Sequence, residues 1–416
     1  MPARAILSAT AAGALLLSLA ACSPPAAMPL PAPEPTPSAT PAGDGILRIG
    51  TVFPTSGAVS FLGPAQIAGV EVAVREINEA GGVLGVPVEV VHRDSGEAAS
   101  QTAEASFRDL VAQGVDVVIG PTSSAIAQRL VPLALETKVP MISPAATFPA
   151  FGDIPDAGFA ARTIPAYDLQ GLALAHELAG KRVALVAVDD ELGRSLVTVL
   201  ERGLAERGGE LVLQQFVPAG GDPAGAIAAA RDAGPDALVL ASAYSSFDTS
   251  KALITQALGA GFGAGRLWLT SQNTGDYNQA FPPGTLAGVN GVIDGVQPDD
   301  AFIGRLKGVD GNLSQFRYSQ EAYDAVMLAA LAAITARDDA GTAIAAHLGD
   351  ASRGGVKCLS FTECAQALRT LPDIDYDGRT GPLDLDADGD VEAGAFGVYA
   401  YDGDNKFVHQ RTVPAD

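Results

Sequence analysis

The most evident shortage in this chain of 416 residues is positive charge. Lysine and arginine together number 26 against 48 aspartates and glutamates, so the formal net charge is -22 at neutral pH. Proteins that bind nucleic acids need clusters of lysine and arginine to neutralise phosphates. The composition therefore argues against a nucleic-acid partner and is typical of a solvated acidic surface.

Catalytic motifs are also missing. The four histidines are scattered along the chain, and neither a His-Glu-x-x-His nor a Gly-x-Ser-x-Gly pattern occurs. We therefore predict that the protein is not an enzyme and that it needs no cofactor and no metal. A hydrolase that uses a cleft without these motifs remains an alternative.

No segment is long and apolar enough to predict a membrane-spanning helix. Residues 1–21 contain one basic residue, Arg4, and a short apolar run over 11–20. A basic start, an apolar middle and small residues at the cleavage site are typical of an export signal. The stretch Leu19-Ala20-Ala21-Cys22 resembles the bacterial lipobox, which would make Cys22 the lipidated residue. The alternative is an ordinary secretory signal with an incidental cysteine.

The next segment, residues 22–45, is dense in proline and alanine and shows no apolar periodicity. Segments of this kind stay extended and act as semi-rigid spacers. Two or more acyl chains on Cys22 would give stable membrane attachment. We therefore predict an exported protein that a lipid anchor and a tether hold at the extracytoplasmic face of the cell membrane.

Cysteine is scarce, since the chain has only three. With Cys22 assigned to the lipid, Cys358 and Cys364 remain as a pair. An even remainder in an exported protein suggests a disulfide, here one that closes a small local loop. A metal site is the alternative, but no histidine lies near these cysteines in the sequence.

The rest of the chain, from about residue 46 to 416, is long enough for two domains. Short apolar segments typical of buried strands alternate with segments of helical periodicity. The predicted strands are 46–52, 86–90, 115–119, 140–142, 182–188, 211–216, 237–241, 267–269 and 395–401. This alternation predicts an α/β protein with two Rossmann-like lobes, each built on a parallel sheet that helices cover on both faces. Because open α/β sheets bind ligands at the carboxyl ends of their strands, we expect a binding cleft between the lobes.

Two loops that follow neighbouring strands form the candidate site. The first, residues 119–124, leaves a strand and enters a helix, and it contains Ser123 and Ser124. Backbone N–H groups at a helix start suit a carboxylate, although one of these serines alternatively only caps its own helix. The second loop, residues 142–147, offers the Ala145 carbonyl and the Thr147 hydroxyl to an ammonium group. Both ends of a buried zwitterion would then be bonded.

These loops and several turn motifs resemble the branched-chain amino acid-binding proteins of ABC importers, over most of the chain after the tether. The resemblance is carried by Thr55-Ser56-Gly57, Gly69 through Asn78, Gly81-Gly82-Val83-Leu84-Gly85, Asp94, Val118-Ile119-Gly120, Met141-Ile142-Ser143-Pro144-Ala145-Ala146-Thr147, Tyr376-Asp377-Gly378 and Gly381-Pro382. It implies the type I periplasmic-binding-protein fold, with three crossover strands near 163–166, 290–296 and 380–390. Lobe 1 would comprise residues 46–163 and about 296–382, and lobe 2 residues 164–295 and about 383–416.

By this resemblance, Ser124 and Thr147 would hold a ligand carboxylate, and Ala145 and Thr147 would bind its amino group. The second lobe departs from the family pattern, because Gln272 stands near the place where an acid that pairs with an α-ammonium is expected. Asp276 lies close but displaced, and Tyr167 is a further candidate for an aromatic wall. The full predicted ligand set is Leu62, Ser123, Ser124, Ala145, Ala146, Thr147, Leu192, Tyr244 and Gln272. The ligand is then an amino acid or a related amide, urea or carboxylic acid.

The resemblance implies a monomer that captures a small polar molecule and delivers it to an ABC permease. A ligand sensor of the same fold that reports to a signalling partner is the alternative. Two acidic runs, which start at Asp373 and Asp384, suggest calcium. The helices that an EF-hand loop joins are missing there, because Gly381-Pro382 comes directly after the first run, so we expect no calcium site.

Overall fold

The first lobe is built on a five-stranded sheet in the order β2-β1-β3-β4-β5, in which every pair of neighbours is parallel. The computed structural model describes residues 43–243 and 247–415. The strands are β1 (Arg48–Phe53), β2 (Glu89–Asp94), β3 (Val117–Ile119), β4 (Met141–Ser143) and β5 (Ala160–Arg162). The described residues do not include the predicted export signal, Cys22 or most of the predicted tether. No helix in the described ranges is long and apolar enough to cross a membrane.

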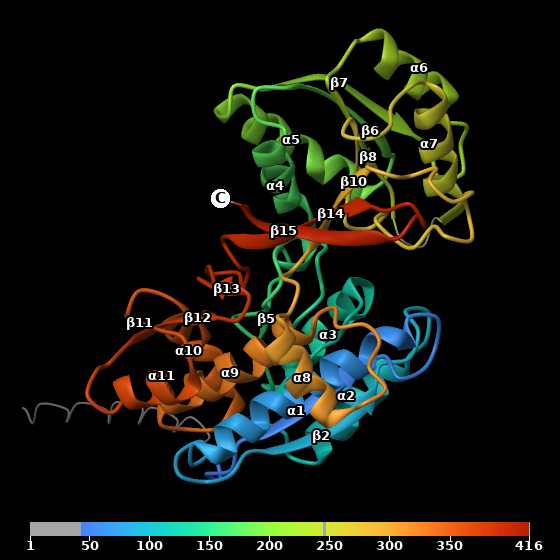
Figure 1. The fold of residues 1–416 in the computed structure, drawn as a ribbon. Helices are drawn as coiled ribbons and strands as arrows, with labels where there is room; N and C mark the ends of the chain where they lie inside the picture. Colours follow the sequence, from blue (N-terminus) through green and yellow to red (C-terminus); the bar gives the residue numbers. More distant parts are fainter. Residues whose placement is uncertain (1–42, 244–246, 416) are drawn as a thin grey trace, which may run out of the picture. The chain divides into compact units, whose positions relative to one another are not determined.

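Helices bury both faces of this sheet. Because successive side chains of a strand point to opposite faces, neighbouring residues of β3 pack against different helices. Val117 and Ile119 pack with α1 (Gly63–Glu79) and α9 (Ser319–Ala336). Val118 packs on the other face with α2 (Thr102–Ala112) and α3 (Ser124–Thr137). The rest of this lobe comprises α8 (Asp300–Val309), α10 (Gly341–Ser352), β11 (Val356–Cys358), α11 (Phe361–Ala367), β12 (Ile374–Gly378) and β13 (Gly381–Pro382), which lie around α9 and α1 in Figure 1.

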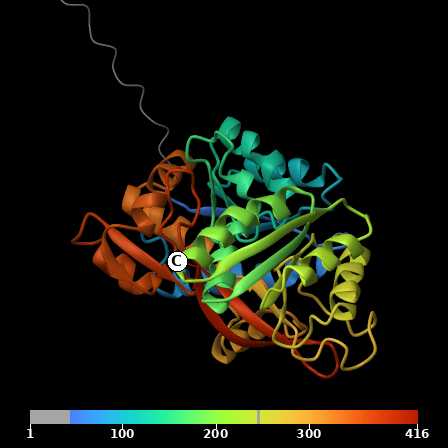
Figure 2. The ribbon, with the colours of Figure 1, turned by 90° about the horizontal axis from the view of Figure 1, so that it is seen from above.

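The second lobe is built on a seven-stranded sheet in the order β15-β14-β10-β9-β8-β6-β7. Its strands are β6 (Arg182–Val188), β7 (Glu210–Val217), β8 (Ala237–Ala241), β9 (Leu267–Leu269), β10 (Asn290–Asp294), β14 (Gly394–Tyr401) and β15 (Phe407–Ala415). The first five are parallel, whereas β14 and β15 join antiparallel at the edge, a feature that the sequence pattern did not predict. Figure 2 shows these two long strands side by side.

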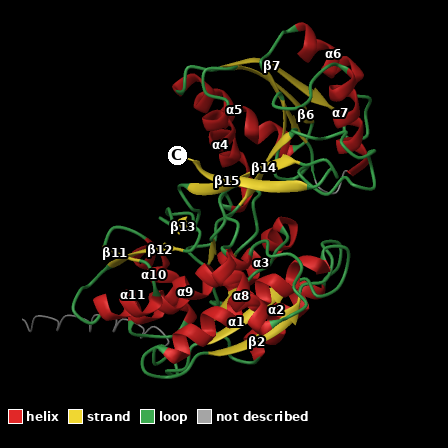
Figure 3. Ribbon diagram, in the orientation of Figure 1, coloured by secondary structure: helices red, strands yellow, loops and turns green. Residues whose placement is uncertain are grey.

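Helices cover both faces of this second sheet as well (Figure 3). The residues of α4 (Gln170–Glu177) and α5 (Glu191–Glu206) pack on the face that carries Leu185 and Val239. The residues of α6 (Ala224–Asp232) and α7 (Phe247–Gly259) pack on the opposite face, on Val186 and Leu240. The predicted α/β architecture of two lobes is therefore confirmed.

Three connections pass from one lobe to the other, between β5 and the 3-10 helix Tyr167–Leu169, between β10 and α8, and between β13 and β14. Residues of all three line a small cavity of about 10 Å³, among them Thr163, Gly295 and Val391. Glu321 of α9 also lines this cavity. Its carboxylate accepts a hydrogen bond from the Val296 N–H at 3.3 Å, and its backbone carbonyl accepts one from the Thr163 hydroxyl at 2.7 Å. Glu321 thus ties two of the connections to α9, one through its buried carboxyl and the other through its backbone carbonyl.

The disulfide that the sequence suggests is present in the structure, where Cys358 and Cys364 are bonded to each other. It joins the end of β11 to α11 and is fully buried in the core of the first lobe. The two acidic runs form no metal cluster within the described residues. The Asp386 carboxylate, for example, accepts hydrogen bonds from the backbone N–H groups of Asp388 and Asp390.

Replacement of Gly69 tests the close contact between α1 and α9. A Cβ at Gly69 would collide with the backbone carbonyl of Ser319, which cannot move without the whole helix. We expect Gly69→Ala to lower the free energy of unfolding by about 1–3 kcal/mol in urea titrations, as overpacked cores do. The matched control is Gly259→Ala at the end of α7, where a Cβ meets nothing within 4 Å. A loss of stability in the control equal to that of Gly69→Ala would contradict the account.

A second prediction concerns pH and Glu321. Burial raises the pKa of the Glu321 carboxyl to about 8, with a smaller contribution from the Asp324 and Asp294 charges. Because this folded-state pKa lies above the ordinary value of 4.5, its contribution to stability is complete below pH 4.5 and is lost as pH rises through about 8. We expect Glu321→Gln to be more stable than the parent protein at pH 9, by roughly 1–3 kcal/mol.

The same comparison at pH 5 supplies the reference, because the parent carboxyl is protonated there and the advantage of the glutamine should disappear. Glu79→Gln, at an exposed position at the end of α1, is the matched control and should show no such pH dependence. Parallel stability-versus-pH curves for Glu321→Gln and the parent protein would refute the assignment.

Candidate ligand-binding cleft

A cleft of about 600 Å³ lies where the strands of both sheets end. From the first lobe, the loops after β1, β2, β3 and β4 line it. From the second lobe, Leu192 follows β6, Ala243 follows β8, and Ser271 and Gln272 follow β9. Parallel strands place their carboxyl ends at one edge of a sheet, which explains why these loops meet. The cleft thus occupies the position that the sequence predicts for a ligand.

The N-terminus of α3 forms one wall of the cleft, through Ser123 and Ser124. Ser123 is the N-cap residue but makes no side-chain cap hydrogen bond, and the first turn has no acidic residue. The Ser124 hydroxyl oxygen accepts a hydrogen bond from the Phe148 N–H at 3.3 Å, so its own proton can be donated to a ligand. Within the described residues, no acceptor is bonded to the N–H groups of Ala125 and Ile126. This helix end therefore suits an anion.

The loop after β4 forms the adjacent wall, where Ala145 and Thr147 line the cleft. The Ser143 hydroxyl holds this loop in place, because it donates to the Pro121 carbonyl at 2.7 Å and accepts from the Ala145 N–H at 3.3 Å. The backbone of Thr147 is fixed by its carbonyl, which accepts from the Tyr167 N–H at 2.7 Å. None of the described residues donates to the Ala145 carbonyl, so this acceptor can serve a ligand.

The structure corrects the assignment of Ala146. Its side chain is fully buried in the core between the sheet and α3 and does not line the cleft. Both of its backbone groups are also engaged, because its N–H donates to the Ser143 hydroxyl at 2.9 Å and its carbonyl accepts from Arg162 at 3.0 Å. Ala146 therefore offers nothing to a ligand, although it stands between two residues that do.

The other predicted site residues are distributed as follows. Leu62, Leu192 and Gln272 line the cleft, whereas Tyr244 lies outside the described residues. Asp276, considered as a displaced acid, is exposed, and its carboxylate accepts from the Asn278 N–H at 3.0 Å instead. The suggestion that Tyr167 forms an aromatic wall is wrong. Its ring is buried in the core of the second lobe, and its hydroxyl donates to Thr270 at 3.0 Å.

Sequence reasoning missed several residues of the cleft, among them Phe61, Phe148, Arg317 and Tyr318. Phe61 belongs to a 3-10 helix (Ser60–Leu62), a single turn that is too short to show periodicity. Arg317 and Tyr318 directly precede α9, where the backbone of Tyr318 is left-handed with φ 63°. No sequence signal predicts such a conformation for tyrosine.

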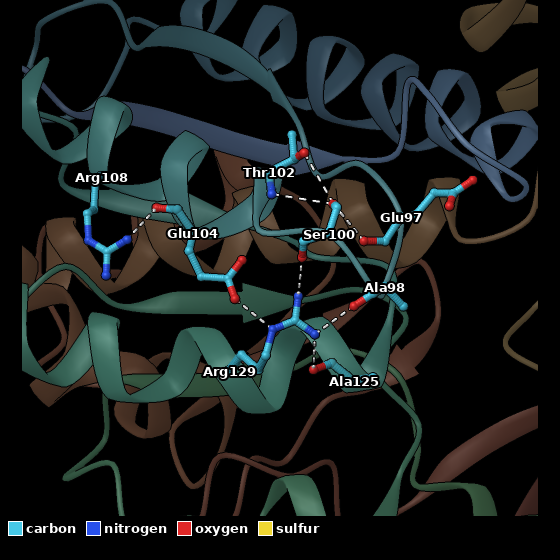
Figure 4. Close-up of polar contacts among 8 residues, drawn as sticks. All are labelled: Glu97, Ala98, Ser100, Thr102, Glu104, Arg108, Ala125 and Arg129. Atoms are coloured by element: carbon cyan, nitrogen blue, oxygen red, sulfur yellow. Dashed lines mark hydrogen bonds and ion pairs between the residues drawn. The ribbon is translucent and has the colours of Figure 1, made fainter.

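Arg129 of α3 holds the loop after β2 against the first turn of α3 (Figure 4). Its guanidinium donates to the Ala98 carbonyl at 2.8 Å and the Ser100 carbonyl at 3.0 Å, and it pairs with Glu104 at 2.6 Å. The Arg129 hydrogen bond holds the pKa of the Glu104 carboxyl below its usual value, although burial opposes this shift. Ala98 lines the cleft together with the first residues of α3, so this network fixes the shape of that wall of the cleft.

Asp94, at the end of β2, holds the loop after β1 in a similar way. Its carboxylate accepts from the Ser56 hydroxyl at 2.5 Å, from the Thr55 N–H at 2.8 Å and from the Gly96 N–H at 2.9 Å. Partial burial alone would raise the pKa of Asp94, but these hydrogen bonds lower it to about 2. The carboxylate is therefore ionised at any physiological pH, and it ties together two loops that line the cleft.

Arg162, at the end of β5, is fully buried behind the loop after β4. Its guanidinium donates to the carbonyls of Ala146 and Phe148 at 3.0 and 2.9 Å, and it forms an ion pair with Asp390. These two carbonyls flank Thr147. Asp390 lies in the third connection between the lobes, so Arg162 joins the binding loop to that connection.

This geometry predicts that Arg162→Lys weakens ligand binding about tenfold in a folded protein. A lysine keeps the charge opposite Asp390 but lacks the planar fork that holds two carbonyls at once. The comparison variant is Asp390→Asn, which leaves both carbonyl hydrogen bonds in place and should change the dissociation constant less than threefold. Isothermal titration with any ligand that stabilises the parent protein measures both. Equal affinities in Arg162→Lys and the parent would exclude this positioning role.

Two lobes with a cleft between the ends of their strands are the architecture of a binding protein. A family model described as periplasmic binding protein matches residues 46–401. The chain therefore belongs to the periplasmic binding protein family.

Individual relatives agree with this membership. The chain is 27% identical over 361 residues to the chemotactic signal transduction system substrate-binding protein BasB of Halobacterium salinarum. The alignment covers 82% of this chain and 84% of that protein. Among solved structures, it resembles the branched-chain amino acid transporter substrate-binding protein LivJ of Streptococcus pneumoniae in complex with isoleucine. That match has a TM-score of 0.61 and 22% identity, and it covers 88% of this chain and 100% of that one.

A third match is the solute-binding protein of an ABC transporter from Rhodopseudomonas palustris HaA2 in complex with p-hydroxybenzoic acid. Its TM-score is 0.64 at 20% identity, with 89% of this chain and 98% of that chain covered. Identities this low show that the fold is shared and do not identify the ligand of this chain.

Proposed function

We propose that the protein is an exported solute-binding lipoprotein that captures a small carboxylate-bearing molecule and delivers it to an ABC permease. The observation that carries this proposal is the N-terminus of α3, where Ser123, Ser124 and Ala125 line the cleft and the cap residue makes no side-chain hydrogen bond. The Thr147 hydroxyl and the Ala145 carbonyl add polar groups on the adjacent loop. The solved relatives named above hold isoleucine and p-hydroxybenzoic acid, both of which carry a carboxylate.

In this mechanism the ligand docks first on Ser124, Ala145 and Thr147 of lobe 1. Leu192 and Gln272 of lobe 2 then close over it, because the ligand contacts both lobes only in the closed state. Lobe 1 comprises residues 46–163 and about 296–382, and lobe 2 comprises residues 164–295 and about 383–416. The closed form would be the one that a permease recognises, and no chemical step takes place in the cleft.

Attachment to the membrane is a further part of the proposal. Residues 1–21 act as the export signal, Cys22 carries the acyl chains, and residues 22–45 hold the lobes away from the membrane surface. Metabolic labelling with a fatty acid analogue tests this part directly. Label in the parent protein and none in Cys22→Ser supports the anchor, and equal labelling of the two proteins contradicts it.

A sensory role is the second candidate, and one observation favours it. The relative BasB belongs to a chemotactic signal transduction system and is matched over most of its length. Fold alone does not separate the two roles. The two roles can be separated by measuring uptake of the radiolabelled ligand in cells that lack the protein. Loss of uptake supports transport. Unchanged uptake together with a lost behavioural response supports sensing.

The binding function is tested by a thermal-shift screen across amino acids, amides, ureas and carboxylic acids. A ligand at 100 times its dissociation constant should add about 2.7 kcal/mol to the free energy of unfolding. We expect Thr147→Ala to weaken the binding of that ligand by a factor of ten or more, while the unfolding temperature of the free protein stays nearly unchanged.

The matched control is Thr255→Ala on α7, an exposed position whose hydroxyl bonds the Lys251 carbonyl. This variant should bind as the parent does. Unchanged affinity in Thr147→Ala would remove the proposed site, whatever the ligand.

A further inference from the structure

The loop after β9 places a buried hydroxyl without a hydrogen-bond partner at the cleft. Ser271 of this loop lines the cleft from the second lobe and is 1% exposed. Within the described ranges of the chain, its hydroxyl is bonded to no donor or acceptor. Burial of an unbonded hydroxyl costs free energy, because the group has given up its hydrogen bonds to water. Such a group in a folded protein calls for an explanation.

The other buried polar side chains of this loop are all bonded. The Thr270 hydroxyl accepts from the Tyr167 hydroxyl and donates to the side-chain carbonyl of Asn273, both at 3.0 Å. The Asn273 amide donates to the Leu240 carbonyl at 3.0 Å, and the Thr274 hydroxyl donates to the Thr270 carbonyl at 2.9 Å. These bonds fix the loop on both sides of the serine, so its unbonded hydroxyl does not result from a loosely held segment.

Gln170, the first residue of α4, holds the backbone of Ser271. Its side chain is fully buried, its carbonyl oxygen accepts from the Ser271 N–H at 2.9 Å, and its amide donates to the Tyr167 carbonyl at 2.7 Å. The Tyr167 N–H donates in turn to the Thr147 carbonyl at 2.7 Å. Three consecutive hydrogen bonds between buried residues thus join Ser271 of the second lobe to Thr147 of the first. Gln170 thereby fixes where Ser271 stands relative to the binding loop after β4.

A role in packing alone does not account for Ser271. An alanine would occupy nearly the same space and would avoid the cost of the unbonded hydroxyl. Contact with a ligand does account for the serine, because closure of the second lobe brings this loop against a molecule that Thr147 holds. A serine hydroxyl is neutral and both donates and accepts, so it can bond a carboxylate oxygen as well as an N–H group.

We infer that the Ser271 hydroxyl supplies a hydrogen bond by which the second lobe holds the ligand, and that Gln170 is the positioning residue that keeps Ser271 in place. This inference rests on the proposed function, because it concerns the same cleft and the same closure. Gln170 is not among the described residues that line the cleft, so it acts on affinity only through Ser271.

The experiment measures the dissociation constant by isothermal titration and the unfolding temperature of the free protein. The probes are isoleucine, p-hydroxybenzoate and the compound that raises the unfolding temperature most in the thermal-shift screen. We expect Ser271→Ala to weaken the binding of the tightest of these probes about tenfold, which is the value of one hydrogen bond. The unfolding temperature of the free variant should equal or exceed that of the parent, because the alanine removes an unbonded hydroxyl.

Gln170→Leu should weaken the same probe to a similar extent. It should also lower the unfolding temperature, because the Ser271 N–H and the Tyr167 carbonyl both lose their partner. In the Ser271→Ala background, Gln170→Leu should change the dissociation constant further by less than about threefold, since a residue that acts through Ser271 then has nothing left to position. Fully additive losses in the double variant would overturn the positioning role.

Ser250→Ala in α7 is the matched control, because Ser250 is a buried serine of the same lobe whose hydroxyl is bonded to that of Ser242 at 2.7 Å. This variant should lower the unfolding temperature and leave the affinity unchanged. Unchanged affinity in Ser271→Ala, or a drop in unfolding temperature as large as that of Ser250→Ala, would overturn the inference. If Thr147→Ala still weakens the probe in that case, the proposed function stands. The proposed function fails only if no compound of the screen binds in a manner that depends on Thr147.

Discussion

The structure depends on one constraint, which is that a parallel sheet must be covered on both faces. Helices such as α1 and α3 meet this requirement in the first lobe, and α5 and α7 meet it in the second. The connections from strand to helix then gather at the carboxyl edge of each sheet, where no helix can cover them. The backbone N–H groups at the start of α3 are consequently left without intrahelical partners at the wall of the cleft.

Hydrogen bonds within the first lobe hold the loops that line the cleft in place. Asp94 and Arg129 fix the loops after β1 and β2, and Ser143 and Arg162 fix the loop after β4. The groups offered to a ligand are therefore largely preorganised, which reduces the ordering cost of binding. The second lobe contributes neutral residues such as Leu192 and Gln272.

Local patterns predicted much of this architecture from the sequence. The strands 182–188 and 237–241 lie where their short apolar segments placed them, because strands that are buried on both faces are apolar along nearly their whole length. The antiparallel addition of β14 and β15 was missed, since the pattern of a strand does not reveal its partner. Ala146 was misassigned, and Arg162 was overlooked because its partner Asp390 lies 228 residues further along the chain. Pairings over such distances leave no local signal.

The central claim is that one ligand occupies the cleft between the strand ends of the two lobes, with a carboxylate at the start of α3. A crystal structure of the protein grown with a ligand that stabilises it tests this claim most directly. The account predicts density for a carboxylate within hydrogen-bond distance of Ser124 and Thr147, with Gln272 or Leu192 in contact on the opposite side. Ligand density outside the cleft, or in the cleft with its carboxylate turned away from α3, would contradict it.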